Sequence, residues 1–208
     1  MRLLPRRAES LVESIIAITV ITLSTTAALV LIQTSIGGNR VIGEKVVALN
    51  LALEGIEAVK NIRDTNYLNF ASNPEECWNS VNATAVSNCA TRDLMEDGDT
   101  YYLKRNLRNE EQRLLWTLET NSAYGDISHY EIYDSSGSTV IAEMYAQSGL
   151  ESFASFSLIE EDVYTRVLEF SENDYDPDNA IDVTSTVSWE NKGNTYTVSL
   201  TRTIANVY

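Results

Sequence analysis

The most regular feature of the sequence is a long apolar stretch near its N-terminus. Residues 14–36 are apolar apart from Ser, Thr and Gln, and no charged residue occurs from Ser14 to Asn39. A bilayer core about 30 Å thick is crossed by roughly 20 mostly apolar helical residues, so this run of 23 residues predicts a membrane-spanning helix. A cleaved secretory signal has a shorter apolar region that ends at a small-residue cleavage site. We therefore expect a helix that the chain retains.

Helical periodicity continues beyond the apolar stretch. Apolar residues recur at helical spacing along one face, at Val46, Leu49, Leu53, Ile56, Val59 and Ile62. The other face is charged, with Glu44, Lys45, Glu54, Glu57, Lys60 and Arg63. Residues 14–64 would together form a mostly helical segment about 75 Å long, with Gly37 and Gly38 as a point of bending or partial melting. The amphipathic half is suited to pack against a folded domain.

The remainder of the chain shows β-type alternation from residue 101 onward. Three hairpins are predicted, from segments 130–134 and 139–145, 156–160 and 163–170 around Glu161-Asp162, and 181–189 and 195–204. Apolar residues alternate with Thr, Ser and charged residues, which implies one buried and one hydrated face. The predicted fold class is therefore α+β, a long N-terminal helix packed by an antiparallel β-sheet head.

The segment 65–100 between helix and head has no sustained period and is expected to be an irregular loop. It contains both cysteines of the chain, Cys77 and Cys89. A bridge between them would close a loop of 13 residues and contribute about 3 kcal/mol in the chain-entropy model. Two free thiols are the alternative. A disulfide is favoured because this segment is expected outside the membrane, where disulfides persist.

Charge is distributed very unevenly along the chain. The net charge is −15, yet residues 1–8 contain three Arg and no acid, while residues 40–208 contain 28 acidic and 12 basic residues. Basic residues before an apolar helix keep the N-terminus cytoplasmic, which predicts a single-pass protein of the cytoplasmic membrane with its head outside. The acidic head argues against a nucleic-acid partner, because phosphate neutralisation needs clustered Lys and Arg.

Two acids, Glu9 and Glu13, lie at the edge of the apolar stretch. A carboxylate here either stays hydrated at headgroup level or has a partner or function. Residues 6–17 read Arg-Arg-Ala-Glu-Ser-Leu-Val-Glu-Ser-Ile-Ile-Ala, which resembles the N-terminal signal of type IV prepilins and type II secretion pseudopilins. In that family a basic leader ends in a small residue, prepilin peptidase cuts on the cytoplasmic side, and the new N-terminus is methylated.

The resemblance implies a role for three residues. Ala8 would be the small residue before the cut, and Glu9 the new N-terminal residue. Glu13 would pair with the free amine of a neighbouring subunit in the filament, where a buried carboxylate needs a partner. The sequence departs from the family at two positions, since Gly usually stands where Ala8 is, and Phe or Met where Glu9 is. These departures bear on cleavage and methylation.

The resemblance also implies a function. The chain would be a structural subunit, a minor pilin, of a type IV pilus-like extracellular filament with an adhesive or mechanical role. Its partners would be other pilin subunits, prepilin peptidase, the inner-membrane assembly platform and, before assembly, the membrane. Alternatives are a pseudopilin of a type II secretion system and a surface protein with a plain N-terminal anchor. The expected division is a leader (1–8), a transmembrane and assembly helix (9–39), its amphipathic half (40–64), a loop (65–100) and a β head (101–208).

An acidic run near the C-terminus suggests a cation site. Carboxylates alternate in a pattern that resembles the first nine positions of an EF-hand-type calcium loop, at Asp174, Asp176, Asp178 and Asp182. Asn179 stands in place of the usual Gly, and Ser185 where a bidentate Glu closes the loop. The alternatives are a Ca²⁺ site and an acidic loop between strands; no cofactor is otherwise required.

Catalytic motifs are not recognisable in the sequence. His129 is the single histidine and lies in a β-type stretch, where we expect a strand residue and not a general base. The Ser and Gly residues form neither a nucleophile elbow nor a phosphate-binding loop. We therefore expect no enzymatic activity.

Overall fold

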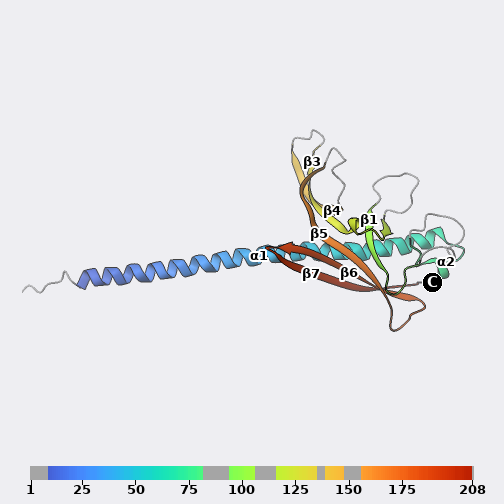
Figure 1. Ribbon diagram of the computed structural model, residues 1–208, viewed down its shortest axis with the longest axis horizontal. Helices are drawn as coiled ribbons and strands as arrows, with labels where there is room; N and C mark the ends of the chain where they lie inside the picture. Colours follow the sequence, from blue (N-terminus) through green and yellow to red (C-terminus); the bar gives the residue numbers. More distant parts are fainter. Residues whose placement is uncertain (1–8, 82–93, 106–115, 135–138, 148–155, 208) are drawn as a thin grey trace, which may run out of the picture. The chain divides into compact units, whose positions relative to one another are not determined.

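A computed structural model describes residues 9–81, 94–105, 116–134, 139–147 and 156–207 (Figure 1). The chain divides into two compact units, Met1–Glu44 and Lys45–Tyr208. The described part of the first unit is helical, and the second contains the rest of the same helix and the sheet. The helical elements are α1 (Glu9–Asn69), α2 (Pro74–Cys77) and the 3-10 turn η1 (Ser122–Gly125). The strands are β1 (Thr100–Arg105), β2 (Trp116–Glu119), β3 (Asp126–Tyr133), β4 (Val140–Gln147), β5 (Phe156–Glu172), β6 (Ala180–Asn191) and β7 (Asn194–Ala205).

Helix α1 is longer and more regular than the sequence pattern predicts. It contains 61 residues and continues through Gly37 and Gly38, so the expected partial melting at this pair is wrong. A glycine costs a helix only about 1 kcal/mol relative to alanine, so a pair of glycines does not by itself end a helix of this length. Helix α1 is long and apolar enough, by length and composition, to cross a membrane.

The seven strands form one antiparallel sheet around β5. Its first half pairs with β3 and its second half with β1, while β6 pairs along the opposite edge. Strand β4 extends the sheet beyond β3, β2 beyond β1, and β7 beyond β6. The chain is therefore α+β, with a long N-terminal helix packed against an antiparallel sheet, as predicted.

Two predicted hairpins are confirmed and one is wrong. Strands β3 and β4 pair as expected, and so do β6 and β7. The predicted turn at Glu161-Asp162 does not exist, because 156–172 is one continuous strand. Ile127 pairs with Tyr164 and His129 with Glu160, so the two acids lie in a register irregularity opposite β3. A β-bulge places an extra residue within a continuous strand and so interrupts the alternation by which a strand is recognised in the sequence.

The core lies between the sheet and one face of the second half of α1. In Figure 1, β5, β6 and β7 run alongside this part of the helix. The helix residues in the core are Ala48, Leu51, Ala52, Ile56, Ala58, Val59 and Ile62. Sheet residues facing them include Tyr164, Leu168, Val183, Val187 and Trp189. These contacts hold the helix against the sheet mainly by burial of apolar surface.

The predicted apolar face is right in its second half and wrong in its first. Ile56, Val59 and Ile62 are fully buried, but Val46, Leu49 and Leu53 remain 53%, 47% and 44% exposed. The sheet instead approaches the side of the helix that carries the smaller residues Ala48 and Ala52. Small side chains permit close packing of a helix on a sheet, and a pattern based only on large apolar residues does not register them.

A glycine lies at a close approach of helix and sheet. A Cβ added at Gly55 would lie 2.6 Å from Ser185 Oγ, 3.1 Å from Leu168 Cδ2 and 3.2 Å from Arg166 Cδ. The neighbouring guanidinium of Arg166 is 4% exposed and donates to Leu51 O and Glu54 Oε2, each at 3.0 Å. Burial lowers the pKa of Arg166, and the Glu54 carboxylate opposes that shift. Packing and the ion pair of the buried Arg166 with Glu54 therefore fix the same contact.

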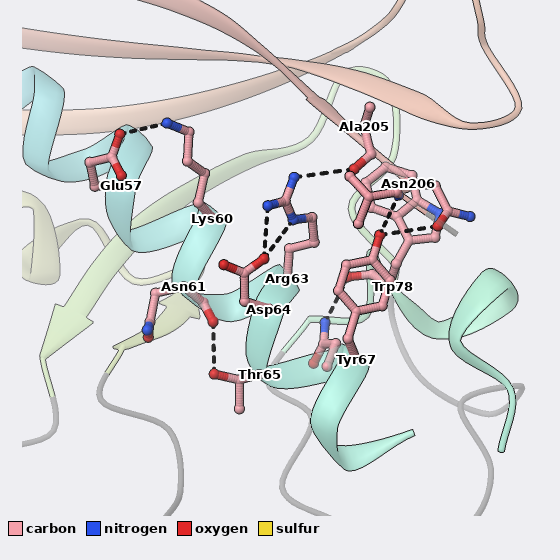
Figure 2. A network of polar contacts seen from close by, with 12 residues as sticks. Glu57, Lys60, Asn61, Arg63, Asp64, Thr65, Tyr67, Trp78, Ala205 and Asn206 are labelled. Carbon is pink, nitrogen blue, oxygen red and sulfur yellow. Dashed lines mark hydrogen bonds and ion pairs between the residues drawn. The ribbon is translucent and has the colours of Figure 1, made fainter. Parts of the chain in front are cut away.

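Polar contacts tie the end of α1 to the C-terminus of β7 (Figure 2). Arg63 Nη1 donates to Ala205 O at 3.2 Å, and Tyr67 OH donates to Asn206 Oδ1 at 3.0 Å. The buried Asn66 donates through Nδ2 to Trp78 O at 2.9 Å and to Ser80 O at 2.8 Å. Together these bonds hold the helix end to both the last strand and the segment after α2.

Candidate membrane-anchoring and assembly helix

The described part of the first unit exposes almost all of its side chains. Exposure of the large apolar residues ranges from 55% at Ile32 to 71% at Leu31 over residues 11–36. These residues are Leu11, Val12, Ile15, Ile16, Ile18, Val20, Ile21, Leu23, Leu29, Val30, Leu31, Ile32 and Ile36. Such a continuous apolar surface is unfavourable in water and marks a membrane or protein contact.

Hydroxyl side chains within the apolar stretch are satisfied by the helix itself. Thr19 donates to Ile15 O at 2.7 Å, and Ser24 donates to Val20 O at 2.7 Å. The same bond to a preceding carbonyl is made by Thr22, Thr25, Thr26 and Thr34. A hydroxyl bonded in this way needs no water. These Ser and Thr residues are therefore compatible with lipid or a dry helix interface.

Glu13 is the charged exception in this surface. It lies in the second turn of α1 and is exposed. Within the described residues, no hydrogen bond or ion pair involves its carboxylate. Ala8 and the leader arginines lie outside the described residues, and Glu9 is described only as the first residue of α1. A carboxylate on an apolar helix requires a counter-charge once water is removed.

Exposed apolar residues also occur in the second unit, on α1 beyond the predicted membrane span. Val46, Leu49 and Leu53 follow one another at helical spacing and lie on a side of the helix that the sheet leaves open. A membrane anchor does not require apolar side chains at these positions. They offer a narrow apolar stripe of the kind that packs against a second helix.

The cysteine pair is described only in part. Cys77 ends α2, is 1% exposed and packs with Phe70. It is disulfide-bonded, whereas Cys89 lies outside the described residues. The bridge between Cys77 and Cys89 stays a prediction. Burial of Cys77 against the helix end means that its bond stabilises the region where α1 meets the head.

The acidic loop is organised by an asparagine that sequence reasoning missed. Asn173 is 6% exposed; its Oδ1 accepts from the backbone N–H groups of Tyr175 and Asp176, and its Nδ2 donates to Asp182 Oδ1 at 3.0 Å. Thr203 also donates to Asp182 Oδ1, at 2.6 Å. The alternating carboxylates identified the acids in the sequence, but the sequence did not predict the Asx-type turn that Asn173 makes.

The structure does not bring the four predicted calcium ligands together. Asp176 Oδ1 accepts a hydrogen bond from Asn179 at 3.1 Å. Asp182 Oδ1 accepts from the Asn173 amide and the Thr203 hydroxyl. Among the described residues, which include Asp174 and Asp178, no group of three or more His, Cys, Asp or Glu side chains could hold a metal ion. Calcium binding by this loop stays a prediction.

His129 lies in β3, as the sequence pattern indicates. Its Nε2 is 3.2 Å from Glu143 Oε2, and its ring stacks on Tyr145 with 4.5 Å between centroids. Both partners belong to β4, so the imidazole stabilises the pairing of two strands.

The ion pair of Arg166 with Glu54 was not predicted from the sequence, because it depends on how β5 lies on α1.

Comparison with known proteins does not place the chain in a family: no family model matches it, and neither does a curated protein or a solved structure.

Proposed function

We propose that this protein is a structural subunit, a minor pilin, of a type IV pilus-like extracellular filament. The observation that carries the proposal is the exposed apolar surface of α1 over residues 11–36, which contains a single carboxylate, Glu13. The resemblance of residues 6–17 to prepilin signals and the packing of the same helix against an antiparallel sheet support it. The helix would serve first as a membrane anchor and later as the part that assembles.

The proposed sequence of events follows the distribution of charge. Three leader arginines hold the N-terminus in the cytoplasm while the apolar helix spans the membrane. Prepilin peptidase then cuts after Ala8, which removes those three positive charges and creates a free amine at Glu9, the site of methylation in the family. During assembly the Glu13 carboxylate pairs with the amine of a neighbouring subunit, which neutralises both charges in a dry environment and sets the axial register.

The stripe formed by Val46, Leu49 and Leu53 favours a filament subunit over a plain membrane anchor. These residues follow the predicted span and are about half exposed. A plain anchor leaves them in water, whereas helix packing in a filament covers them. A type II secretion pseudopilin shares this architecture and is the second candidate. Genes for a retraction ATPase near the coding gene would support a pilus, and genes for a secretion system would support a pseudopilus.

The test of this proposal is a Glu13→Ala substitution in cells that carry prepilin peptidase and the assembly platform. We expect normal membrane insertion, measured by membrane fractionation, and loss of the chain from the sheared filament fraction. Gln33→Ala is the matched control, because it removes a polar group from the same apolar stretch without removing a charge. Incorporation of the Glu13→Ala chain at the level of the control would refute the role of Glu13.

A further inference from the structure

Strand β7 forms an edge of the sheet. It pairs with β6 over its full length, from Ala180 opposite Ala205 to Asn191 opposite Asn194, without a register shift. No described strand pairs with its other side, and Figure 1 shows β7, in dark red, at the border of the sheet. A long regular edge strand is a template for the addition of another strand.

The turn that precedes β7 determines which backbone groups point outward. Lys192 and Gly193 have φ of 53° and 76° and connect the strands as a two-residue hairpin. In such a hairpin the closing pair Asn191 and Asn194 is hydrogen-bonded, and bonded pairs then alternate along the ladder. The outward N–H and C=O groups therefore belong to Thr195, Thr197, Ser199, Thr201, Thr203 and, at the end of the strand, Ala205, whose C=O accepts from the Arg63 side chain. In the part of the chain that the structure describes, no backbone hydrogen bond uses them.

The usual protections of an edge strand are missing from β7. Its sequence, NTYTVSLTRTIA, contains no proline and no lysine, and its ladder has no bulge. It carries one charge, Arg202, and no acid, although residues 40–208 contain 28 acidic residues. Electrostatic repulsion between two copies of this acidic protein is thus low along this strand. Open backbone groups and low local repulsion together favour self-association here.

We propose that β7 pairs with β7 of a second copy in antiparallel orientation, about a two-fold axis at Ser199. This register joins the outward groups from Thr195 to Thr203, because Thr197 faces Thr201 and Thr195 faces Thr203. It also repeats chemistry that the sheet already contains, since Thr184 and Thr201 hydroxyls, and those of Thr186 and Ser199, lie 2.9 Å apart across β6 and β7.

The side chains of β7 on the other face of the sheet, those of the even-numbered residues, are also self-complementary in this register. Val198 faces Leu200, which joins two apolar side chains, and Tyr196 faces Arg202, which places a guanidinium beside an aromatic ring. A dyad interface requires a surface that matches itself in this way. The inference uses only residues of the second unit, so its test does not depend on cleavage at Ala8 or on the proposed role of Glu13.

Cysteine cross-linking of the full chain in detergent micelles tests the register. Facing residues of a hydrogen-bonded antiparallel pair have Cα atoms about 5.5 Å apart, a distance that a disulfide spans. Ser199→Cys is therefore expected to form a covalent dimer with itself under mild oxidation. Thr197→Cys and Thr201→Cys are each about 13 Å from their own copies, so each alone should stay uncrosslinked and their mixture should link.

Three further variants separate this interface from other contacts. Thr186→Cys lies one strand inward, on β6, and should not link. Ser199→Pro removes only an outward-facing N–H, which an edge strand tolerates, and Ser199→Lys places two like charges across the axis. Both should leave the thermal unfolding midpoint close to that of the parent and weaken dimerisation at least about tenfold in sedimentation equilibrium.

Three results would overturn the proposal. The first is a chain that stays monomeric, as expected if this edge receives a segment of a different protein or nothing. The second is cross-linking of Ser199→Cys no faster than that of Thr186→Cys. The third is a dimer of unchanged affinity in both the Pro and the Lys variants at Ser199, which would place self-association on another surface such as the apolar helix.

Discussion

The substitution Gly55→Ala tests the close packing of helix and sheet. Two opposing effects decide its result. Alanine favours a helix over glycine by about 1 kcal/mol. The new Cβ, however, would lie 2.6 Å from Ser185 Oγ and within 3.2 Å of atoms of Leu168 and Arg166. Overpacking of a dense core costs about 1–3 kcal/mol, and Ser185 is fully buried. We expect a net loss of about 1–2 kcal/mol.

The measurement is urea unfolding of the full chain in detergent, followed by the fluorescence of buried tryptophans such as Trp189. Gly43→Ala is the matched control, because nothing lies within 4 Å of the added Cβ, and it should be neutral or stabilising. Ser185→Ala removes the nearest atom, a buried hydroxyl without a hydrogen-bond partner among the described residues, and should recover most of the loss. The reasoning fails if Gly55→Ala stabilises the chain as Gly43→Ala does, or if Ser185→Ala has the same effect with and without Gly55→Ala.

Three further predictions concern the head. Glu54→Ala leaves the buried Arg166 with a single carbonyl acceptor and should cost about 2–3 kcal/mol of folding stability. Arg166→Met leaves a carboxylate that is 41% exposed and should cost about 1 kcal/mol or less. Equal losses of stability in urea unfolding would contradict this asymmetry. Gly193→Ala forces a side chain onto a backbone with φ of 76° and should cost about 1–2 kcal/mol by the same assay, and an unchanged midpoint would oppose it. If the 174–182 loop binds Ca²⁺, calorimetric titration should show saturable heat that Asp176→Asn reduces, and no heat at millimolar Ca²⁺ ends that idea.

Features set by local pattern were predicted from the sequence. The apolar stretch and its helical continuation predicted α1 because the apolar residues of a helix recur at helical spacing along the sequence. The hairpin between β6 and β7 was predicted because residues 190–194 separate two alternating segments. The structure shortens this connection to the two residues Lys192 and Gly193. Both features depend on residues close together in the chain.

Features set by distant contacts were not predicted. The acids Glu161 and Asp162 gave a turn signal, but pairing with β3 and β6 on either side keeps β5 continuous. Contact with the sheet determines which face of α1 is buried, and that face contains Ala48 and Ala52 but not Val46. The ion pair of Arg166 with Glu54 likewise joins residues far apart in sequence. Such choices depend on packing, which overrides local preference.

The candidate assembly residues were identified from a short motif. The interaction that this motif implies joins two subunits, so a single chain contains only one of the two partners. Glu13 has no counter-charge within the described residues, and the proposed partner is an amine on another subunit. Ala8 and the leader lie outside the described part of the chain. The predicted roles of Ala8, Glu9 and Glu13 therefore depend on the resemblance and on experiments with processed, assembled protein.

Intact-mass measurement after incubation with prepilin peptidase tests the central claim most directly. The full chain in membrane vesicles should lose residues 1–8 and begin at Glu9, while the Ala8→Phe variant, which places a large residue before the cut, should keep its leader. An unchanged mass for the parent chain, in vesicles where a known prepilin is cleaved, would contradict the account and favour a plain N-terminal anchor.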